Sequence, residues 1–214
     1  MSRTTVVVAL MMAVCGGLLA AGSQRAAQPN CVTIATPSPA KIYTYQHTDS
    51  SGAVTRTTQQ WERVDATGFR ERVTTPAGVQ IKENEHHIVD DVSVIDRTST
   101  LNANGKVIDA TTFVPGIVGD PAFRACAGKS WPIPRTTATY NPGSHKATTP
   151  VGTLTIVAIR EKITVPAGTF DTVHYKRTSQ SIDEYWKSTA EGVIVKHVGS
   201  VQGGGVTEVL QSIK

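Results

Sequence analysis

The alternation of short β-branched runs with turn-forming residues constrains the fold of this 214-residue chain more than any other feature. Thr, Val and Ile recur along the chain, and such side chains fit the half-buried surface of a pleated sheet. No stretch of ten or more residues combines apolar positions at helical spacing with a capping residue. Short helical candidates are residues 120–126 and 182–188. The pattern predicts an all-β or mainly β protein with at most one or two short helices.

Turn signals follow the strand-like runs about every ten residues, which is typical of an antiparallel meander. The tripeptide Pro-Ala-Gly occurs at 76–78 and again at 166–168. Proline presets φ for a turn, and glycine accepts the left-handed conformation that closes a bulged hairpin, so both copies predict hairpin turns. Their recurrence is either the chance reuse of a good turn or the trace of a duplicated half.

Apolar and polar residues alternate in several runs, which predicts a sheet with one solvated face. Val79 and Ile81, for example, alternate with polar residues, whereas residues 154–159 are apolar on both faces and predict a central strand. The break at 141–145 predicts a loop within the domain, because the part that follows is too short to form a stable sheet alone. We expect the meander to curve into a half-barrel or open barrel.

Residues 1–23 have the pattern of a secretory signal peptide. Arg3 precedes a long apolar run without acidic residues, and small residues follow at Ala21–Ser23, where we expect cleavage. The run is slightly shorter than the roughly 20 apolar residues of a membrane span. The chain is therefore predicted to be secreted or periplasmic. The alternative is a lipoprotein anchored to the membrane through Cys15, which is disfavoured because Val14 is larger than the residue that precedes a lipidated cysteine.

Two segments follow the predicted signal peptide. Residues 24–40 contain three prolines and form an extended lead-in, and residues 41–214 form a single β-rich domain. Cys31 and Cys126 remain after cleavage, an even pair in an oxidising compartment. We predict the disulfide Cys31–Cys126, which would pin the lead-in to the domain and stabilise the fold by about 2–4 kcal/mol. Two buried free thiols are the alternative.

Charge and motifs exclude several classes of function. The formal net charge is +4, without the clustered basic stripe that binds nucleic acid. The nucleophile elbow Gly-x-Ser-x-Gly is absent. Gly128-Lys129 lacks the glycine that a phosphate-binding loop needs five residues earlier, where Phe123 stands. The sequence predicts no catalytic residues, no cofactor-binding residues and no cofactor.

Four residues within a span of six are candidate metal ligands: His86, His87, Asp90 and Asp91. Histidine and carboxylate are ordinary zinc ligands. On one continuous strand, His86 and Asp90 would share a face but lie about 13 Å apart, too far for one ion unless the chain turns between them. The competing interpretation is solvated charge on an edge strand. These residues carry our alternative function, a metal-dependent hydrolase.

Three motifs of the C-terminal half occur together in a familiar order. They are Gly-Lys-Ser-Trp at 128–131, Thr-Val-Pro-Ala-Gly-Thr-Phe at 164–170, and Glu-Tyr-Trp-Lys at 184–187 followed by Glu-Gly-Val-Ile-Val-Lys at 191–196. This order resembles the TapB-like family of bacterial secreted or lipid-anchored β-rich proteins over about residues 120–214. The family has a second glycine where Val193 or Ile194 stands here. The resemblance implies an envelope location and a half-barrel like that of lipoprotein carriers, and it implies no catalytic residues.

The aromatic residues are either core or the lining of a ligand groove. Tyr43 and Tyr45 share one face of a predicted strand, and Trp61, Trp131 and Trp186 lie within or at the edges of strands. A curved sheet with an apolar concave side would hold a lipid or another small apolar molecule. The sequence therefore favours a non-enzymatic, secreted envelope protein that binds an apolar ligand or another envelope protein.

Overall fold

The β-branched runs form sixteen strands and no helix within residues 30–75, 81–201 and 204–214, which the computed structural model describes. The strands are β1 (Cys31–Thr33), β2 (Tyr43–Thr48), β3 (Val54–Arg63), β4 (Gly68–Thr74), β5 (Ile81–Val89), β6 (Val92–Leu101), β7 (Val107–Pro121), β8 (Arg124–Cys126), β9 (Ser130–Ile133), β10 (Thr137–Asn141), β11 (Lys146–Thr148), β12 (Gly152–Val165), β13 (Gly168–Thr178), β14 (Ile182–Ser188), β15 (Ile194–Val201) and β16 (Gly204–Ile213). The predicted all-β fold is confirmed. The described part of the chain has no helix able to span a membrane.

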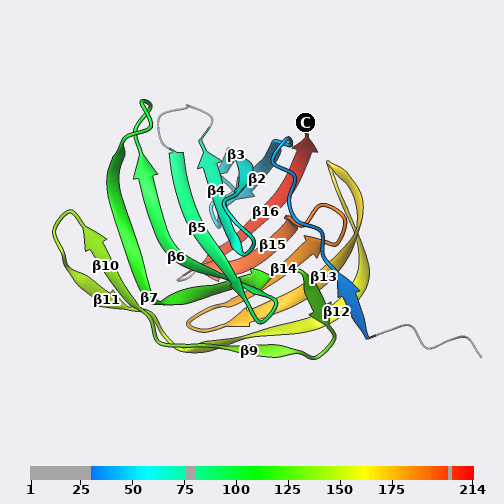
Figure 1. The fold of residues 1–214 in the computed structure, drawn as a ribbon. Coiled ribbons are helices and arrows are strands. Elements are labelled where there is room, and N and C mark those ends of the chain that lie inside the picture. Colours follow the sequence, from blue (N-terminus) through cyan, green and yellow to red (C-terminus); the bar gives the residue numbers. More distant parts are fainter. Residues whose placement is uncertain (1–29, 76–80, 202–203) are drawn as a thin grey trace, which may run out of the picture.

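Fourteen of the described strands form one antiparallel sheet, in the order β11-β10-β7-β6-β5-β4-β3-β2-β16-β15-β14-β13-β12-β9, and β1 pairs with β8 in a small second sheet. Most of the large sheet is formed by two meanders, β2–β7 and β12–β16, with β10 and β11 added at one end and β9 at the other. The meanders are joined where β2 pairs with β16, with Tyr43 opposite Ile213. The sheet curves strongly without closing into a barrel (Figure 1). The predicted half-barrel or open barrel is thus confirmed.

Two clusters of buried side chains fill much of the curved sheet. One contains Ile34, Trp131, Leu154, Ile156 and Tyr175 among others, and the second contains Tyr43, Tyr45, Trp186 and Leu210 among others. Tyr43 and Tyr45 are fully buried, so the predicted shared face is confirmed as a core face. Core packing therefore uses most of the aromatic residues.

Three local predictions are wrong. Residues 182–188 form strand β14, between β13 and β15, and residues 124–126 form β8, so neither helical candidate is a helix. Pairing with neighbouring strands overrides weak local helix preference in such short segments. Residues 154–159 lie in β12, where Leu154 and Ile156 are buried but Val157 is 51% exposed. This strand lies between β13 and β9, and it packs on the core with one face while Val157 on the other face is exposed to solvent.

The predicted turns are found where the structure describes them. Pro166-Ala167 connects β12 to β13, and Gly168 has a φ of 139°. The other Pro-Ala-Gly copy, at 76–78, lies outside the described residues. The break at 141–145 is the hairpin turn between β10 and β11, where the amide of Tyr140 donates to the carbonyl oxygen of His145 at 3.0 Å. This break is therefore a loop within the large sheet.

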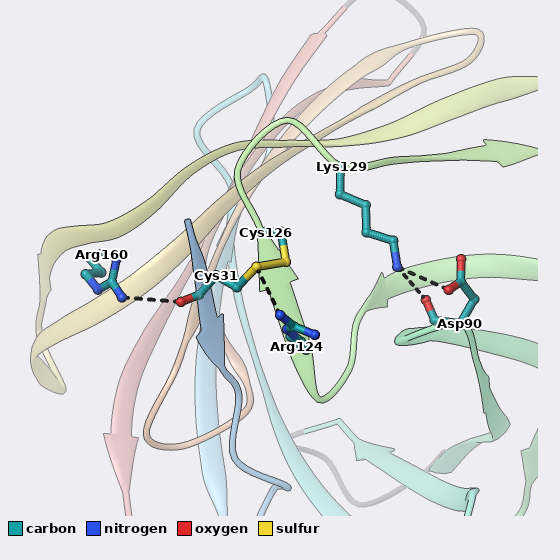
Figure 2. The surroundings of a disulfide bond; sticks show 6 residues. All are labelled: Cys31, Asp90, Arg124, Cys126, Lys129 and Arg160. Atoms are coloured by element: carbon teal, nitrogen blue, oxygen red, sulfur yellow. Dashed lines mark hydrogen bonds and ion pairs between the residues drawn. A yellow bond between two sulfur atoms is a disulfide. The ribbon is translucent and has the colours of Figure 1, made fainter. Parts of the chain in front are cut away.

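The lead-in is held against the sheet by the predicted disulfide. Cys31 and Cys126 are bonded, with their sulfur atoms 2.06 Å apart (Figure 2). The amide of Ile34 then donates to the carbonyl of Phe123 at 2.8 Å, and the amide of Ala35 donates to that of Thr189 at 2.8 Å. We call residues 30–40 the N-terminal strap. It crosses from β8 to the end of β14, while residues 24–29 lie outside the described residues.

Gly192 supports the strap by leaving room for it. Its φ is +69°, and a Cβ atom there would lie 2.0 Å from the carbonyl oxygen of Ala35. We expect Gly192→Ala to lower the free energy of unfolding by about 3 kcal/mol, because the left-handed backbone costs about 1–2 kcal/mol and the strap must also move. Gly105→Ala is the control, since Gly105 has a φ of +74° and open space around it. Equal losses in urea unfolding for the two variants would contradict this role.

Candidate ligand-binding site

A cavity inside the curved sheet is lined by both meanders. Its lining residues are Gln59, Trp61, Glu71, His86, Ile95, Gly119, Asp120, Tyr175, Arg177, Tyr185 and 192–194. The cavity has a volume of about 160 Å³ and is partly open to solvent. We call this cavity the polar chamber. Strands β5 and β13 lie far apart in the sheet order, so only the curvature of the sheet brings their side chains to one cavity.

A second, smaller cavity of about 30 Å³ adjoins the first, since Trp61, His86 and Asp120 line both. Its other lining residues are mostly apolar: Ala35, Thr36, Pro37, Phe69, Ile88, Ser93, Ala122, Phe123 and Lys187. The rings of Phe69 and Phe123 meet edge to face, with centroids 6.3 Å apart. We call this cavity the apolar chamber. The N-terminal strap forms one of its walls.

A buried ion pair joins the two meanders beside both chambers. Lys187 of β14 pairs with Asp120 of β7, and the exposed fractions of their side chains are 7% and 16%. The Lys187 ammonium also donates to the carbonyl oxygen of Pro121 at 2.8 Å. Lys187 alternates with Tyr185 along β14, so both point to the same face. Each charge alone would carry a large desolvation penalty when buried here, and the pairing of Lys187 with Asp120 offsets that penalty.

The wall shared by the chambers has polar atoms without a hydrogen-bond partner. His86 is 7% exposed, and its Nδ1 lies 2.9 Å from the hydroxyl of Ser93. Its Nε2 and the indole Nε1 of Trp61 are buried, and neither has a hydrogen-bond partner among the described residues. The two rings lie side by side, with centroids 5.4 Å apart. An unpaired buried polar group costs about 1–3 kcal/mol, so two together indicate a surface built to contact a polar molecule.

Three tyrosines in and near the polar chamber are held in their neutral form; Tyr175 and Tyr185 line the chamber, and Tyr45 does not. Burial is the main cause that raises the pKa of Tyr45 and of Tyr175 well above the usual value. Burial, followed by the negative charge of Asp183, raises the pKa of Tyr185 to about 12. At His47, a hydrogen bond to Glu208 raises the pKa, and their side chains lie 3.0 Å apart. The phenols therefore remain hydrogen-bond donors at neutral pH.

Stacked rings cover the inner face of β13, β14 and β15. Tyr175 stacks on Tyr185 with centroids 4.9 Å apart, and Tyr185 stacks on His197 at 4.3 Å. A second row is built from the residues next in sequence, so it lies on the opposite face. In that row, Trp186 stacks on His174 at 4.4 Å. Only the first row contributes side chains to the polar chamber.

The four predicted metal ligands point in different directions. Successive positions place His86 and His87 on opposite faces of β5, where His87 Nδ1 lies 2.5 Å from Asp96. Asp90 and Asp91 have positive φ values of 50° and 61° and form the turn between β5 and β6. The assumption of one continuous strand is therefore wrong, because the two aspartates adopt the left-handed conformation of a tight hairpin.

Asp90 also has other partners. Its carboxylate lies 3.2 Å from the ammonium of Lys129 (Figure 2), and its carbonyl accepts from the indole of Trp131 at 2.9 Å. Within the described ranges, no group of three or more His, Cys, Asp or Glu side chains is placed to hold a metal ion. The structure does not assemble the four predicted ligands into one site.

Sequence reasoning missed the charged residues of the chambers. Glu71 and Asp120 belonged to no motif, and Asp120 fell inside a predicted helix. Lys187 ends the motif Glu-Tyr-Trp-Lys, but no role was predicted for it. Asp120 and Lys187 are 67 positions apart, so no local pattern links them. One usable signal was the alternation of Tyr185 and Lys187 on one strand face, which places a lysine in line with a buried aromatic ring. The sequence left Trp61 open as a core or a groove residue; it packs against the second core cluster and also lines both chambers.

Comparison with known proteins does not assign this chain to a family. No model of a known protein family matches the chain, and no curated protein shows significant similarity to it. The resemblance to the TapB-like family therefore stays a prediction. The two chambers are the structural features that bear on function.

Proposed function

We propose that this chain is an exported, non-enzymatic binding protein that holds one small amphipathic molecule inside its curved sheet. The observation that carries the proposal is the pair of adjoining chambers, one mostly apolar and one of mixed polarity, with the unpartnered Nε2 of buried His86 at their boundary. Concave cavities with a mostly apolar lining and a few converging polar groups are typical ligand sites. The sequence alone favoured an apolar ligand. Such a ligand would leave His86 Nε2 and Trp61 Nε1 without hydrogen-bond partners.

The apolar end of the ligand would enter the apolar chamber, which must widen from its volume of about 30 Å³ to hold it. Phe69, Ile88 and Phe123 line it, and Pro37 of the strap also contributes. Burying apolar surface there stabilises a complex by about 25 cal/mol for each Å² removed from water. The polar end would then reach Trp61 and His86 at the boundary.

Export forms part of the same proposal. It is supported by the Cys31–Cys126 disulfide, because such bonds persist in oxidising compartments. The predicted signal peptide, residues 1–23, lies outside the described residues. A second envelope protein as partner stays a prediction from the sequence.

Filling the apolar chamber tests the proposal. The neutral fluorophore N-phenyl-1-naphthylamine should bind the oxidised wild-type protein at one saturable site and be displaced by octyl glucoside. Ala122 is 7% exposed and lines this chamber, so Ala122→Leu should weaken probe binding at least tenfold. Ala190→Leu, at an exposed turn position, is the matched control and should leave binding unchanged.

Two results would overturn the proposal. One is the absence of saturable probe binding to the wild-type protein. The other is equal affinity in the two leucine variants, both shown to be folded by their circular-dichroism spectra. Lipid recovered in an organic extract of the natively purified protein would support the proposal independently.

A further inference from the structure

We infer that the polar end of the ligand is an uncharged, hydroxyl-bearing group that binds between Glu71, His86 and Trp61. This inference rests on the proposed function and names the chemical class of the ligand. It is carried by three polar groups that converge on one place in the polar chamber and still have unused hydrogen-bonding capacity.

The geometry begins with Glu71 and His86. Glu71 Oε2 lies 3.7 Å from His86 Nε2, which is too far for a hydrogen bond. Trp61 is directly opposite Glu71 across β3 and β4, so the two side chains share a face. All three residues line the polar chamber. A ligand oxygen beside Glu71 Oε2 and His86 Nε2 can contact both atoms, and the Trp61 ring lies next to His86 on the same wall, with ring centroids 5.4 Å apart.

Neighbouring residues fix the orientation of this group. The Asn84 amide nitrogen donates to Glu71 Oε2 at 2.7 Å, while the hydroxyl of Thr98 donates to Asn84 Oδ1 at 2.9 Å. Ser93 occupies Nδ1 of His86 at 2.9 Å, which leaves Nε2 for the chamber. The side chains are therefore held in place before a ligand arrives, which lowers the entropic cost of binding.

The hydrogen-bonding chemistry selects a hydroxyl. An indole N–H only donates and a carboxylate only accepts, whereas a hydroxyl does both. A ligand hydroxyl can donate its hydrogen to Glu71 and accept a hydrogen bond from Trp61. Its second lone pair can accept from His86 Nε2 when that nitrogen carries the proton. A single group of this kind satisfies the unpaired atoms of the wall.

Charged head groups fit this place less well. A carboxylate would face Glu71, and it would find Lys187 already paired with Asp120. Arg177, the cation among the lining residues of the polar chamber, is directly opposite Asp183 in the neighbouring strand. A quaternary ammonium would be attracted by Glu71 and by the aromatic rings, but it has no hydrogen-bonding group and would leave Trp61 Nε1 and His86 Nε2 unpaired. The hydrogen-bonding groups of the wall therefore favour a neutral hydroxyl over either ion.

Three amphiphiles with the same tail test the inference: octyl glucoside, octanoate and octyltrimethylammonium. Calorimetric titration of the full oxidised protein at submicellar concentrations and neutral pH should show octyl glucoside binding at least tenfold more tightly than either ion. Equal affinities, or tighter binding of an ion, would overturn the inference and leave the proposed function standing. If none of the three binds and the fluorophore also fails, the proposed function itself is wrong.

A pair of tryptophan variants tests the contact directly. Trp61→Phe should weaken octyl glucoside binding about fivefold or more, because phenylalanine keeps an aromatic ring and lacks the indole N–H. Trp186→Phe is a matched control, because its Nε1 is also buried without a hydrogen-bond partner in the described chain, yet Trp186 lines neither chamber. Equal effects of the two variants on octyl glucoside binding would rule out the proposed contact.

Discussion

Lys187→Met is expected to lower the free energy of unfolding by about 3–5 kcal/mol, because it removes one member of a buried ion pair and leaves the other uncompensated. The Lys187 side chain is 7% exposed, and its ammonium contacts both the carboxylate of Asp120 and the carbonyl of Pro121. Methionine has a similar length, so lost packing contributes little. Urea unfolding followed by circular dichroism measures the effect.

The double variant Lys187→Met/Asp120→Leu is the control. Replacing both charges with apolar side chains removes the desolvation penalty along with the attraction, so it should recover most of the lost stability. The coupling energy between the two sites is then the quantity of interest. A loss below about 1 kcal/mol for the single variant, or no recovery in the double variant, would show that the pair is not buried as the structure has it.

Removing the disulfide should have an effect of similar size. Cys31→Ser/Cys126→Ser is expected to lower the free energy of unfolding by about 4 kcal/mol, because the bond closes a loop whose ends are 95 residues apart and so restricts the unfolded chain. Oxidised wild-type protein treated with dithiothreitol should lose a similar amount in urea unfolding. The serine variant supplies the control, since dithiothreitol must leave its stability unchanged.

The same variant also affects the apolar chamber. The strap residues Ala35, Thr36 and Pro37 form one wall of that chamber, and the disulfide lies directly before them in the chain. We expect weaker binding of N-phenyl-1-naphthylamine when the disulfide is absent, at urea-free conditions where the variant is folded. Unchanged stability and unchanged probe affinity would together mean that the backbone hydrogen bonds of Ile34 and Ala35 hold the strap without the disulfide.

Local physical chemistry made part of this fold predictable. Thr, Val and Ile favour extended backbone wherever they occur, so the β class followed from the sequence. The alternation of Tyr43 and Tyr45 placed both rings on one face, and Pro166-Ala167-Gly168 predicted its own hairpin. Cys31 and Cys126 were the pair left after the predicted signal peptide, and they are bonded. Each of these predictions depends either on the preference of one residue type or on two residues lying two positions apart along a strand.

Other features depend on which distant segments meet, and sequence reasoning failed there. Asp90-Asp91 was taken as part of a strand, although its pairing partners on both sides make it a turn. The candidate site likewise draws Trp61, Glu71 and His86 from one meander, whereas Tyr185 comes from the other. They meet because β2 pairs with β16 and the joined sheet twists and curves.

The sequence by itself therefore indicated the strand content and several turns, because those properties arise from backbone preferences of neighbouring residues. It also indicated the covalent link between the strap and β8, through the two cysteines that lie outside the predicted signal peptide. Only the tertiary structure decided the cavity and its charges. Lys187 and Asp120 become partners through sheet curvature, which is a collective result of packing many side chains and is encoded at no single position.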